Sequence, residues 1–360
     1  MADIKLLVNK KAFTGWKSAR VTRGVESVCG SFDLEVSERW AGQDLARPIG
    51  EEDSCELKLG NTTVITGYVD RRNISFGASE HSFRVSGRDK AGDLVDCSAY
   101  LDKWEYRNIA VDTFIEKVCL PFDIPVTLSE ALGASEAPPI QKLSIDPGDS
   151  AFEAIERACR ASGMLVFSDG MGGIVLARAG TGRCKTALIQ GENILAASAE
   201  YDATSRFRDY AVLGQQNGND NQSGPATAFI KGTASDPNVK RASRTLLVRA
   251  EKPVTFAQAK KRAEWEATVR AGRSATVAIT VQGWTQSNGD IWPVNTLVTV
   301  RSPALGVDGD MLISQATYVT DEGGTLTHLT LRDPRAFTPE PTVPKADKAS
   351  GAWKELAGGV

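Results

Sequence analysis

The spacing of apolar residues changes twice along the chain, and this change limits the fold more than any other feature. In residues 1–97, apolar residues alternate with polar ones, as in Phe32-Asp33-Leu34-Glu35-Val36. Such alternation is typical of half-buried strands, and glycine or polar residues separate these strands, as at Gly30 and Gly60-Asn61. We therefore predict an antiparallel β-barrel or sandwich over residues 1–97.

The next hundred residues contain two segments with helical spacing. Residues 108–119 form the first, which Pro121 stops because proline cannot continue a helix. The second begins with Asp149 or Ser150 as its N-cap and ends at Gly163. A hairpin of two short apolar strands follows. These segments predict a small α/β domain.

Strand-like alternation returns after residue 199, for example in residues 276–281 and 326–331. One more helix is predicted over residues 256–271, and the last residues are rich in Pro, Lys, Ala and Gly, which predicts a mobile tail. The predicted fold class is α+β and predominantly antiparallel β, with two β-barrel-like domains. The predicted division is 1–97 for the first β domain, 98–199 for the α/β domain, 200–215 with 273–337 for the second β domain, 216–272 for an insertion with one helix, and 338–360 for the tail.

Two predicted hairpins are similar to each other. The hairpin over residues 65–89 joins a Tyr-Val strand to a strand that starts at His81 and closes on Arg-Asp. The hairpin over residues 313–333 has the same order, with His328 heading its second strand. Either an internal duplication or chance explains this similarity.

Charge and hydropathy exclude several classes of protein. The chain of 360 residues has 42 Lys plus Arg and 45 Asp plus Glu, so no global positive field would draw it onto nucleic acid or acidic lipid. No apolar run reaches 18 residues, and the stretch Leu6-Leu7-Val8 is too short for a signal peptide. We expect a chain made in the cytoplasm, without membrane insertion.

No motif in the sequence identifies a catalytic, cofactor-binding or metal-binding site. The two histidines, His81 and His328, lack ligand partners at metal-binding spacing, and no Gly-x-Ser-x-Gly or phosphate-binding loop occurs. The six cysteines stand far apart and are interpreted as buried small hydrophobes, as at Cys119 and Cys159 within the two helical patterns. We therefore assign no catalytic, cofactor or metal residue.

Two acidic patterns are candidates for chemistry. Asp89, Asp93 and Asp96 would share one helical face and could bind a cation, but a capped helical turn is the favoured interpretation. Phage-type lysozymes show a Glu-x8-Asp-x5-Thr spacing. Three Glu/Asp pairs satisfy the first interval but lack the Thr, so no catalytic set remains. The pairs are Glu35 with Asp44, Glu80 with Asp89, and Glu200 with Asp209.

A basic cluster lies in the second half of the chain. Few aromatic residues accompany it, so a solvated helix face or a protein interface is favoured over a nucleic-acid groove. Its members are Lys240, Arg241, Arg244, Arg249, Lys260, Lys261, Arg262, Arg270 and Arg273.

Several stretches resemble the baseplate hub protein of Mu-like contractile-tailed phages, and together they cover most of residues 13–213. They are Phe13-Thr14-Gly15-Trp16, Val21-Thr22-Arg23, Val25-Glu26-Ser27-Val28, Thr66-Gly67-Tyr68-Val69-Asp70, Gly87-Arg88-Asp89-Lys90, Asp93-Leu94-Val95-Asp96-Cys97, Ala151-Phe152-Glu153-Ala154-Ile155-Glu156-Arg157-Ala158, Gly191-Glu192-Asn193-Ile194-Leu195 and Arg206-Phe207-Arg208-Asp209-Tyr210.

The resemblance implies a structural function with no enzymatic activity and no cofactor. Such hubs are homotrimers whose two barrel-like tube domains per chain form a ring between the six-fold tail tube and the three-fold central spike. Related architecture occurs in the hub part of type VI secretion spike proteins. The implied partners are the spike protein, a tail tube or tube-initiator protein and other baseplate proteins. Phage DNA would pass the channel without specific binding. The chain would assemble in the host cytoplasm and end in the tail baseplate.

Two other functional classes stay open at this point. One is a hub-associated cell-wall hydrolase. The other is a receptor- or glycan-binding tail module, in which exposed Trp104, Trp284 and Trp292 would serve as sugar platforms.

Overall fold

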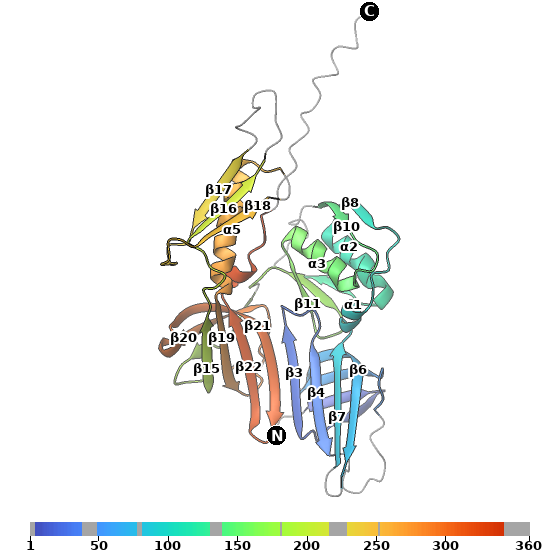
Figure 1. Ribbon diagram of the computed structural model, residues 1–360. Coiled ribbons are helices and arrows are strands. Elements are labelled where there is room, and N and C mark those ends of the chain that lie inside the picture. Colours follow the sequence, from blue (N-terminus) through green and yellow to red (C-terminus); the bar gives the residue numbers. More distant parts are fainter. Residues whose placement is uncertain are drawn as a thin grey trace, which may run out of the picture. The chain divides into compact units, whose positions relative to one another are not determined.

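The chain forms two compact units (Figure 1). The computed structural model describes residues 4–37, 49–77, 81–129, 139–180, 182–215, 229–250 and 253–341. The first unit comprises Met1–Arg206 with Ala267–Pro339, and the second comprises Phe207–Glu266 with Glu340–Val360. No helix among the described residues combines the length and the apolar character needed to span a membrane.

Five antiparallel strands of the first unit build what we call the first β module. Their order across the sheet is β3-β4-β7-β6-β5, and β1 and β2 extend the sheet beyond β5. The alternation predicts the buried face correctly, since Phe32, Leu34 and Val36 all point into the core. The strands are β1 (Ile4–Val8), β2 (Lys11–Phe13), β3 (Ser18–Gly24), β4 (Ser31–Ser37), β5 (Ser54–Leu59), β6 (Thr62–Phe76) and β7 (His81–Asp89).

Five later strands build a second β module with the same topology. Their order across the sheet is β15-β19-β22-β21-β20, which matches the first module strand for strand in chain order. Two short strands, β13 and β14, add to β20 in parallel. The strands are β13 (Gly182–Arg183), β14 (Leu188–Ile189), β15 (Ala196–Tyr201), β19 (Ala275–Gln282), β20 (Thr296–Ser302), β21 (Val307–Asp321) and β22 (Gly324–Arg332), with the 3-10 turns η2 (Pro303–Leu305) and η3 (Pro334–Phe337).

The similar hairpins of the sequence are the β6–β7 and β21–β22 hairpins of the two modules. Each contains a bulge, after Val69 in β6 and after Ile313 in β21. When the two hairpins are aligned at their bulges, Arg88-Asp89 of the first falls at the same position as Arg332-Asp333 of the second. This agreement supports an internal duplication. The histidines do not align, however, and His328 lies in the middle of β22 instead of at its start.

The two modules share one sheet and do not form two closed barrels. Strand β3 pairs with β21 of the other module, from Ala19 opposite Thr320 to Gly24 opposite Gln315. The predominantly antiparallel α+β fold is thus confirmed. The prediction of two separate barrels is wrong. Among the described strands, β3 is the edge strand of the first module, and it pairs with β21 of the second module, so that one sheet runs through both modules. One apolar core runs beneath both modules.

The segment between the modules folds as predicted into helices and short strands over a second apolar core. Helix α3 begins with a capping box, in which the Ser150 side chain accepts from the Glu153 amide and the Glu153 side chain accepts from the Ser150 amide. Gly163, with φ of 65°, ends the helix. The elements are α1 (Gly92–Asp96), β8 (Glu105–Ile109), α2 (Val111–Cys119), the 3-10 turn η1 (Leu120–Phe122), β9 (Val126–Leu128), β10 (Ile140–Ser144), α3 (Ala151–Ser162), β11 (Leu165–Ser168) and β12 (Ile174–Ala177).

The first predicted helix starts later than its pattern indicated. Residues 108–119 were expected to be helical, whereas Asn108 and Ile109 belong to β8. Asn108 adopts a φ of 51°, which an α-helix excludes, so α2 starts at Val111.

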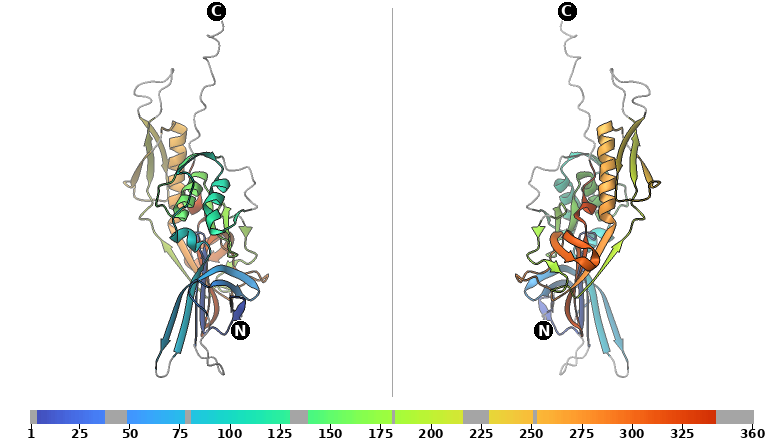
Figure 2. Two further views of the ribbon diagram at one scale, coloured as in Figure 1. Left: turned by 90° about the vertical axis from the view of Figure 1, so that its right-hand side faces the viewer. Right: turned by 90° about the vertical axis from the view of Figure 1, so that its left-hand side faces the viewer.

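The second unit is a three-stranded sheet packed on the first part of a helix, whose residues from Ala267 onward belong to the first unit. Strand β16 (Asp209–Gly214) lies between β17 (Ile230–Ser235) and β18 (Thr245–Arg249), and α5 (Phe256–Arg273) runs alongside them (Figure 2). A Cβ at Gly232 would lie 2.2 Å from the Lys260 nitrogen, so glycine allows the close contact of sheet and helix. Strand β16 lies within residues 200–215, which were predicted to belong to the second β domain. It pairs with β17 and β18 of the second unit. Most of the predicted tail, 342–360, lies outside the described residues.

Candidate functional site

The edges of the two β modules are the main candidate for assembly. Strand β15 pairs with β19 alone among the described strands. Strand β6 pairs with β7 along residues 67–76, but with β5 only along residues 62–68. Among the described strands, β5 therefore pairs with β6 only as far as Tyr68. Both edges are visible in Figure 1.

Apolar side chains are exposed along these two edges. On β6, Ile74 is 46% exposed and Phe76 is 81% exposed. On β15 and the residue before it, Tyr201 is 60% exposed and Leu195 is 57% exposed. Exposed strand edges with large apolar side chains are a hazard for aggregation unless another chain covers them.

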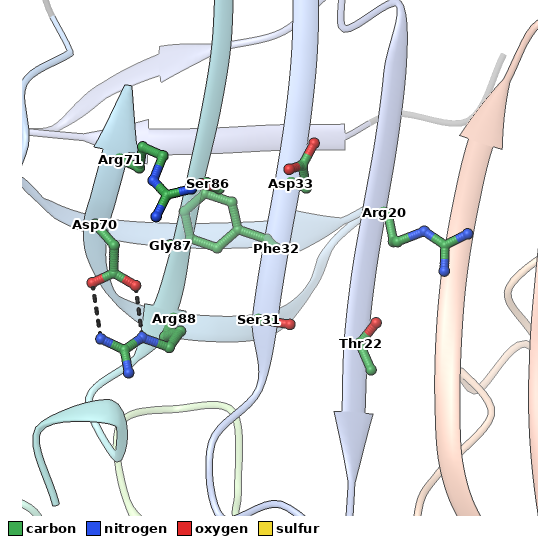
Figure 3. Close-up of a pocket in the computed structure, with 10 residues that line it drawn as sticks. All are labelled: Arg20, Thr22, Ser31, Phe32, Asp33, Asp70, Arg71, Ser86, Gly87 and Arg88. Atoms are coloured by element: carbon green, nitrogen blue, oxygen red, sulfur yellow. Dashed lines mark hydrogen bonds and ion pairs between the residues drawn. The ribbon is translucent and has the colours of Figure 1, made fainter. Parts of the chain in front are cut away.

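A charged hollow of about 430 Å³ lies on the exposed face of the first module (Figure 3). Arg88 on β7 is the centre of its charges, with nitrogen–oxygen distances of 2.7 Å to Asp70 and 2.6 Å to Asp96. These two carboxylates raise the pKa of the Arg88 guanidinium. Arg20 from β3 and Asp33 from β4 line the same hollow. Its walls are charged and few apolar groups converge, which suits a macromolecular surface better than a small ligand.

The acidic cluster of the sequence does not form a metal site. Asp89 is buried, and it accepts hydrogen bonds from the Gly30 amide at 2.6 Å and the Ala91 amide at 3.1 Å. Asp96 turns to Arg88 instead. Within the described ranges, no three His, Cys, Asp or Glu side chains are grouped to hold a metal ion. The favoured interpretation, a helical turn after the first β region, is confirmed as α1, although Ala91 is its N-cap residue and no side chain caps it.

The buried carboxyl of Asp89 predicts a pH-dependent stability. Burial raises its pKa to about 6, above the value of 3.8 expected when unfolded. Between these values the unfolded chain loses its proton first, so the free energy of unfolding falls as the pH rises. The free energy of unfolding of the wild-type chain should fall between pH 5 and pH 7. We expect this fall to be about 1 kcal/mol smaller in Asp89→Asn, measured by urea unfolding at both pH values.

The matched control for this prediction is Asp96→Asn. Asp96 is exposed and Arg88 lowers its pKa, so its substitution should leave the slope between pH 5 and pH 7 unchanged. An unchanged slope in Asp89→Asn would contradict the assignment.

Only one of the three lysozyme-like spacings, Glu200 with Asp209, has both acids among the described residues. Asp44 and Glu80 lie outside the described residues. Glu200 is on β15, and the Asp209 carboxylate accepts a hydrogen bond from the Ser235 hydroxyl at 2.7 Å.

The Nδ1 atom of His328 lies 2.9 Å from the Thr280 hydroxyl on the neighbouring strand.

Three of the six cysteines, Cys55, Cys119 and Cys159, are buried, and so are two of the three tryptophans considered as sugar platforms. Cys119 and Cys159 are buried in the helical pair as predicted, and burial raises the pKa of both thiols to about 12. Trp284 and Trp292 are also buried, so only Trp104, which is 43% exposed, fits the sugar-platform interpretation. Cys97 is exposed, unlike the prediction.

Part of the basic cluster is used within the second unit. The Arg244 guanidinium lies 4.9 Å from the centre of the Phe207 ring, and that of Arg262 lies 4.5 Å from the centre of the Trp265 ring. Arg262 also pairs with Glu266 at 3.0 Å. The Arg262 contacts lie on one face of α5, and the Arg244 contact lies outside the helix, so these basic residues bind groups of their own unit.

Comparisons with known proteins place this architecture among phage tails. Residues 3–89 match the family model "Mu phage baseplate assembly protein GpP-like, N-terminal", residues 91–178 match "Baseplate hub protein gp44-like, second domain", and residues 255–340 match "Mu phage baseplate assembly protein GpP, fourth domain". The second match covers the α/β segment, and the outer two cover most strands of the β modules.

Whole-chain relatives agree with the family models. The chain is 32% identical to the baseplate hub protein gp44 of Escherichia phage Mu over 342 residues, covering 93% of this chain and 88% of that protein. A 43 kDa tail protein of prophage MuSo2 from Shewanella oneidensis is 31% identical, with a TM-score of 0.82 over 94% of this chain and 100% of that one. The fold is also similar to E. coli c3393, a type VI secretion component, at 10% identity and a TM-score of 0.56 over 91% and 76% of the chains.

These matches extend over nearly the whole chain and include both β modules. The predicted resemblance is confirmed, and so is the related fold in a type VI secretion component. The chain belongs to the family of Mu-like phage baseplate hub proteins.

Proposed function

We propose that this protein is a closed homotrimeric hub that adapts the six-fold tail tube to the three-fold central spike. The observation that carries the proposal is the repeated topology, β3-β4-β7-β6-β5 and β15-β19-β22-β21-β20, within one continuous sheet. Three chains with two such modules supply six similar surfaces for the tube, while the true symmetry stays three-fold for the spike.

The mechanism is mechanical. The β modules form the ring, and the α/β segment and the unit around β16 lie outside its repeat. Spike and tube bind through large surfaces, whose shape and charge set their specificity. Phage DNA passes through the channel without specific contacts. The ring assembles in the host cytoplasm and then enters the tail baseplate.

A measurement of mass tests the proposal directly. Light scattering coupled to size exclusion should report about three times the chain mass of 38.6 kDa, with the cognate spike added if the ring needs it to close. A monomer or dimer that persists at high concentration with the spike present would overturn the trimeric hub.

We also propose that the hub has no hydrolytic activity of its own. The family relatives are named as baseplate hub and tail proteins, and the three lysozyme-like spacings lack their third residue. Zymography on peptidoglycan separates this from the alternative of a cell-wall hydrolase. Clearing that Glu35→Gln abolishes would establish the alternative.

A further inference from the structure

We propose that one face of the three-stranded sheet in the second unit binds an acidic, amphipathic helix of another tail protein. We call this surface the β16 face, because it consists of side chains of β16 and its two neighbours that point away from α5. The inference goes beyond the proposed trimeric hub, since a single chain presents the whole face. Its central residues are Lys231, Leu213, Arg249, Thr233, Ala211 and Leu247.

Helix α5 packs on the opposite face of this sheet (Figure 2). Gly232 of β17 lies on the helix side, because a Cβ there would lie 2.2 Å from the Lys260 nitrogen. Val212 of β16 pairs with Gly232 and therefore faces the helix too. Adjacent residues of a strand point to opposite faces, so Lys231 and Leu213 point away from α5. The exposure agrees, since Lys231 is exposed and Gly232 is buried.

The register of the three strands places two cations on either side of one leucine. Leu213 of β16 pairs with Lys231 of β17 and with Arg249 of β18. In the next row of the same face, β18 contributes Leu247, which is 63% exposed. Leu213 itself is half-buried. The β16 face therefore has an apolar centre with a cation at each side.

Both cations are available to a partner. Lys231 and Arg249 are exposed, and neither forms an ion pair with a residue of the described ranges. Arg262 and Arg244, in contrast, bind Glu266 and the Phe207 ring within the unit. Carboxylates are the groups that exposed Lys and Arg side chains bind best, and Arg can bind both oxygens at once. The chemistry of the face thus selects an acidic partner with apolar side chains.

The charge of the surrounding chain favours the same partner. Residues 207–266 contain ten Lys and Arg against six Asp and Glu, whereas the whole chain contains 42 against 45. Such a local excess attracts an acidic surface. A protein is favoured over nucleic acid, because Asp209 lies two rows from Leu213 on the same face and would repel phosphate groups.

The spacing of the two cations matches a helix laid across the strands. Lys231 and Arg249 stand two strands apart, which is about 10 Å. Two carboxylates at positions i and i+7 of a helix share one side and lie about 10.5 Å apart. Apolar side chains at i+3 and i+4 lie between them on that side, where they would cover Leu213 and Leu247.

Peptide binding to the full-length chain tests the proposal. The probe is a fluorescein-labelled helical peptide with Glu at i and i+7 and Leu at i+3 and i+4. The test variant carries Lys231→Glu and Arg249→Glu. The matched control carries Lys240→Glu and Lys261→Glu, which reverse two exposed charges of the same unit outside the β16 face. Fluorescence anisotropy measures the Kd, and thermal unfolding shows that each variant is folded.

We expect the wild-type chain to bind the peptide and the test variant to raise its Kd by about tenfold or more. The control variant should change the Kd by less than about twofold. Leu247→Ser keeps both cations and should raise the Kd about fivefold, because it removes apolar contact area. A peptide of the same composition with its second Glu at i+5, on another side of the helix, should bind about tenfold more weakly.

Several outcomes would overturn the proposal. These are no binding by the wild-type chain at about 1 mM peptide, or equal losses in the test and control variants. Stronger competition by duplex DNA than by unlabelled peptide would assign the face to nucleic acid instead. A lower oligomeric mass in the test variant than in the control would assign it to a contact between copies of this chain.

A fold defect in the test variant leaves the decision to Leu247→Ser, where an unchanged Kd rejects the β16 face. The mass of the wild-type chain, which tests the trimeric hub, is measured separately. The two proposals can therefore fail independently.

Discussion

Replacing Gly87 by valine is expected to prevent the first β module from folding. A Cβ at Gly87 would lie 2.1 Å from the Tyr68 carbonyl oxygen and 2.7 Å from the Phe32 ring. Neither neighbour can retreat, because Tyr68 is in the adjacent strand β6 and Phe32 is 2% exposed in the core. We expect a loss of about 4 kcal/mol or more in the free energy of unfolding, seen as insoluble protein or as a collapse of the thermal transition.

Gly182→Ala is the matched control for Gly87→Val. Gly182 also lies in a strand, but its nearest neighbour atom would be 3.7 Å from the new Cβ. Its stability should stay within about 0.5 kcal/mol of the wild-type value. A Gly87→Val variant with the wild-type melting temperature would refute the close packing at this position. In the second module, Leu331 corresponds to Gly87, and its partner Val277 corresponds to Phe32. The first module therefore has the large side chain on β4, whereas the second module has it on β22.

Replacing Val21 by aspartate is expected to separate the two modules. Val21 is fully buried in β3, between Phe32 on one side and Tyr318 of the other module on the second side. A carboxylate there would be desolvated without a partner, which costs about 4 kcal/mol or more. Denaturant unfolding measures the loss, and limited proteolysis should show new cleavage between the modules.

Arg20→Ala controls for the position of this substitution in the strand. Arg20 precedes Val21, is exposed and lines the charged hollow on the opposite face. Its replacement should change stability by no more than about 0.5 kcal/mol. Equal effects of Val21→Asp and Arg20→Ala would contradict the buried joint.

Local sequence signals predicted the elements of this protein well where neighbours along the chain determine them. The Ser150 capping box and Gly163 define helix α3 from its ends, as their residue types require. The alternation in β4 and β19 identifies the buried faces. Asn108 is an exception, because a positive φ at a single residue overrides an otherwise helical pattern.

The candidate assembly edges could be predicted only in part. The Arg-Asp ends of the two hairpins indicated a duplication, but the Tyr-Val and His matches suggested an alignment that the bulges do not support. A bulge is set by the pairing of two strands and leaves no local mark in the sequence. The exposure of Ile74 and Phe76 likewise depends on which strand stops pairing with β6, not on their spacing.

The sequence by itself determined the period of each segment, the helix ends, the predominance of antiparallel strands and the resemblance to phage hubs. Tertiary structure alone decided that the modules form one sheet and not two barrels. That decision is made by β3 and β21, whose paired residues Val21 and Tyr318 are far apart in the chain. The alternation of apolar residues indicates which face of a strand is buried. It does not indicate which strand lies beside it, because any antiparallel strand with a similar pattern could pair there. The choice of neighbour therefore comes from the packing of the whole core.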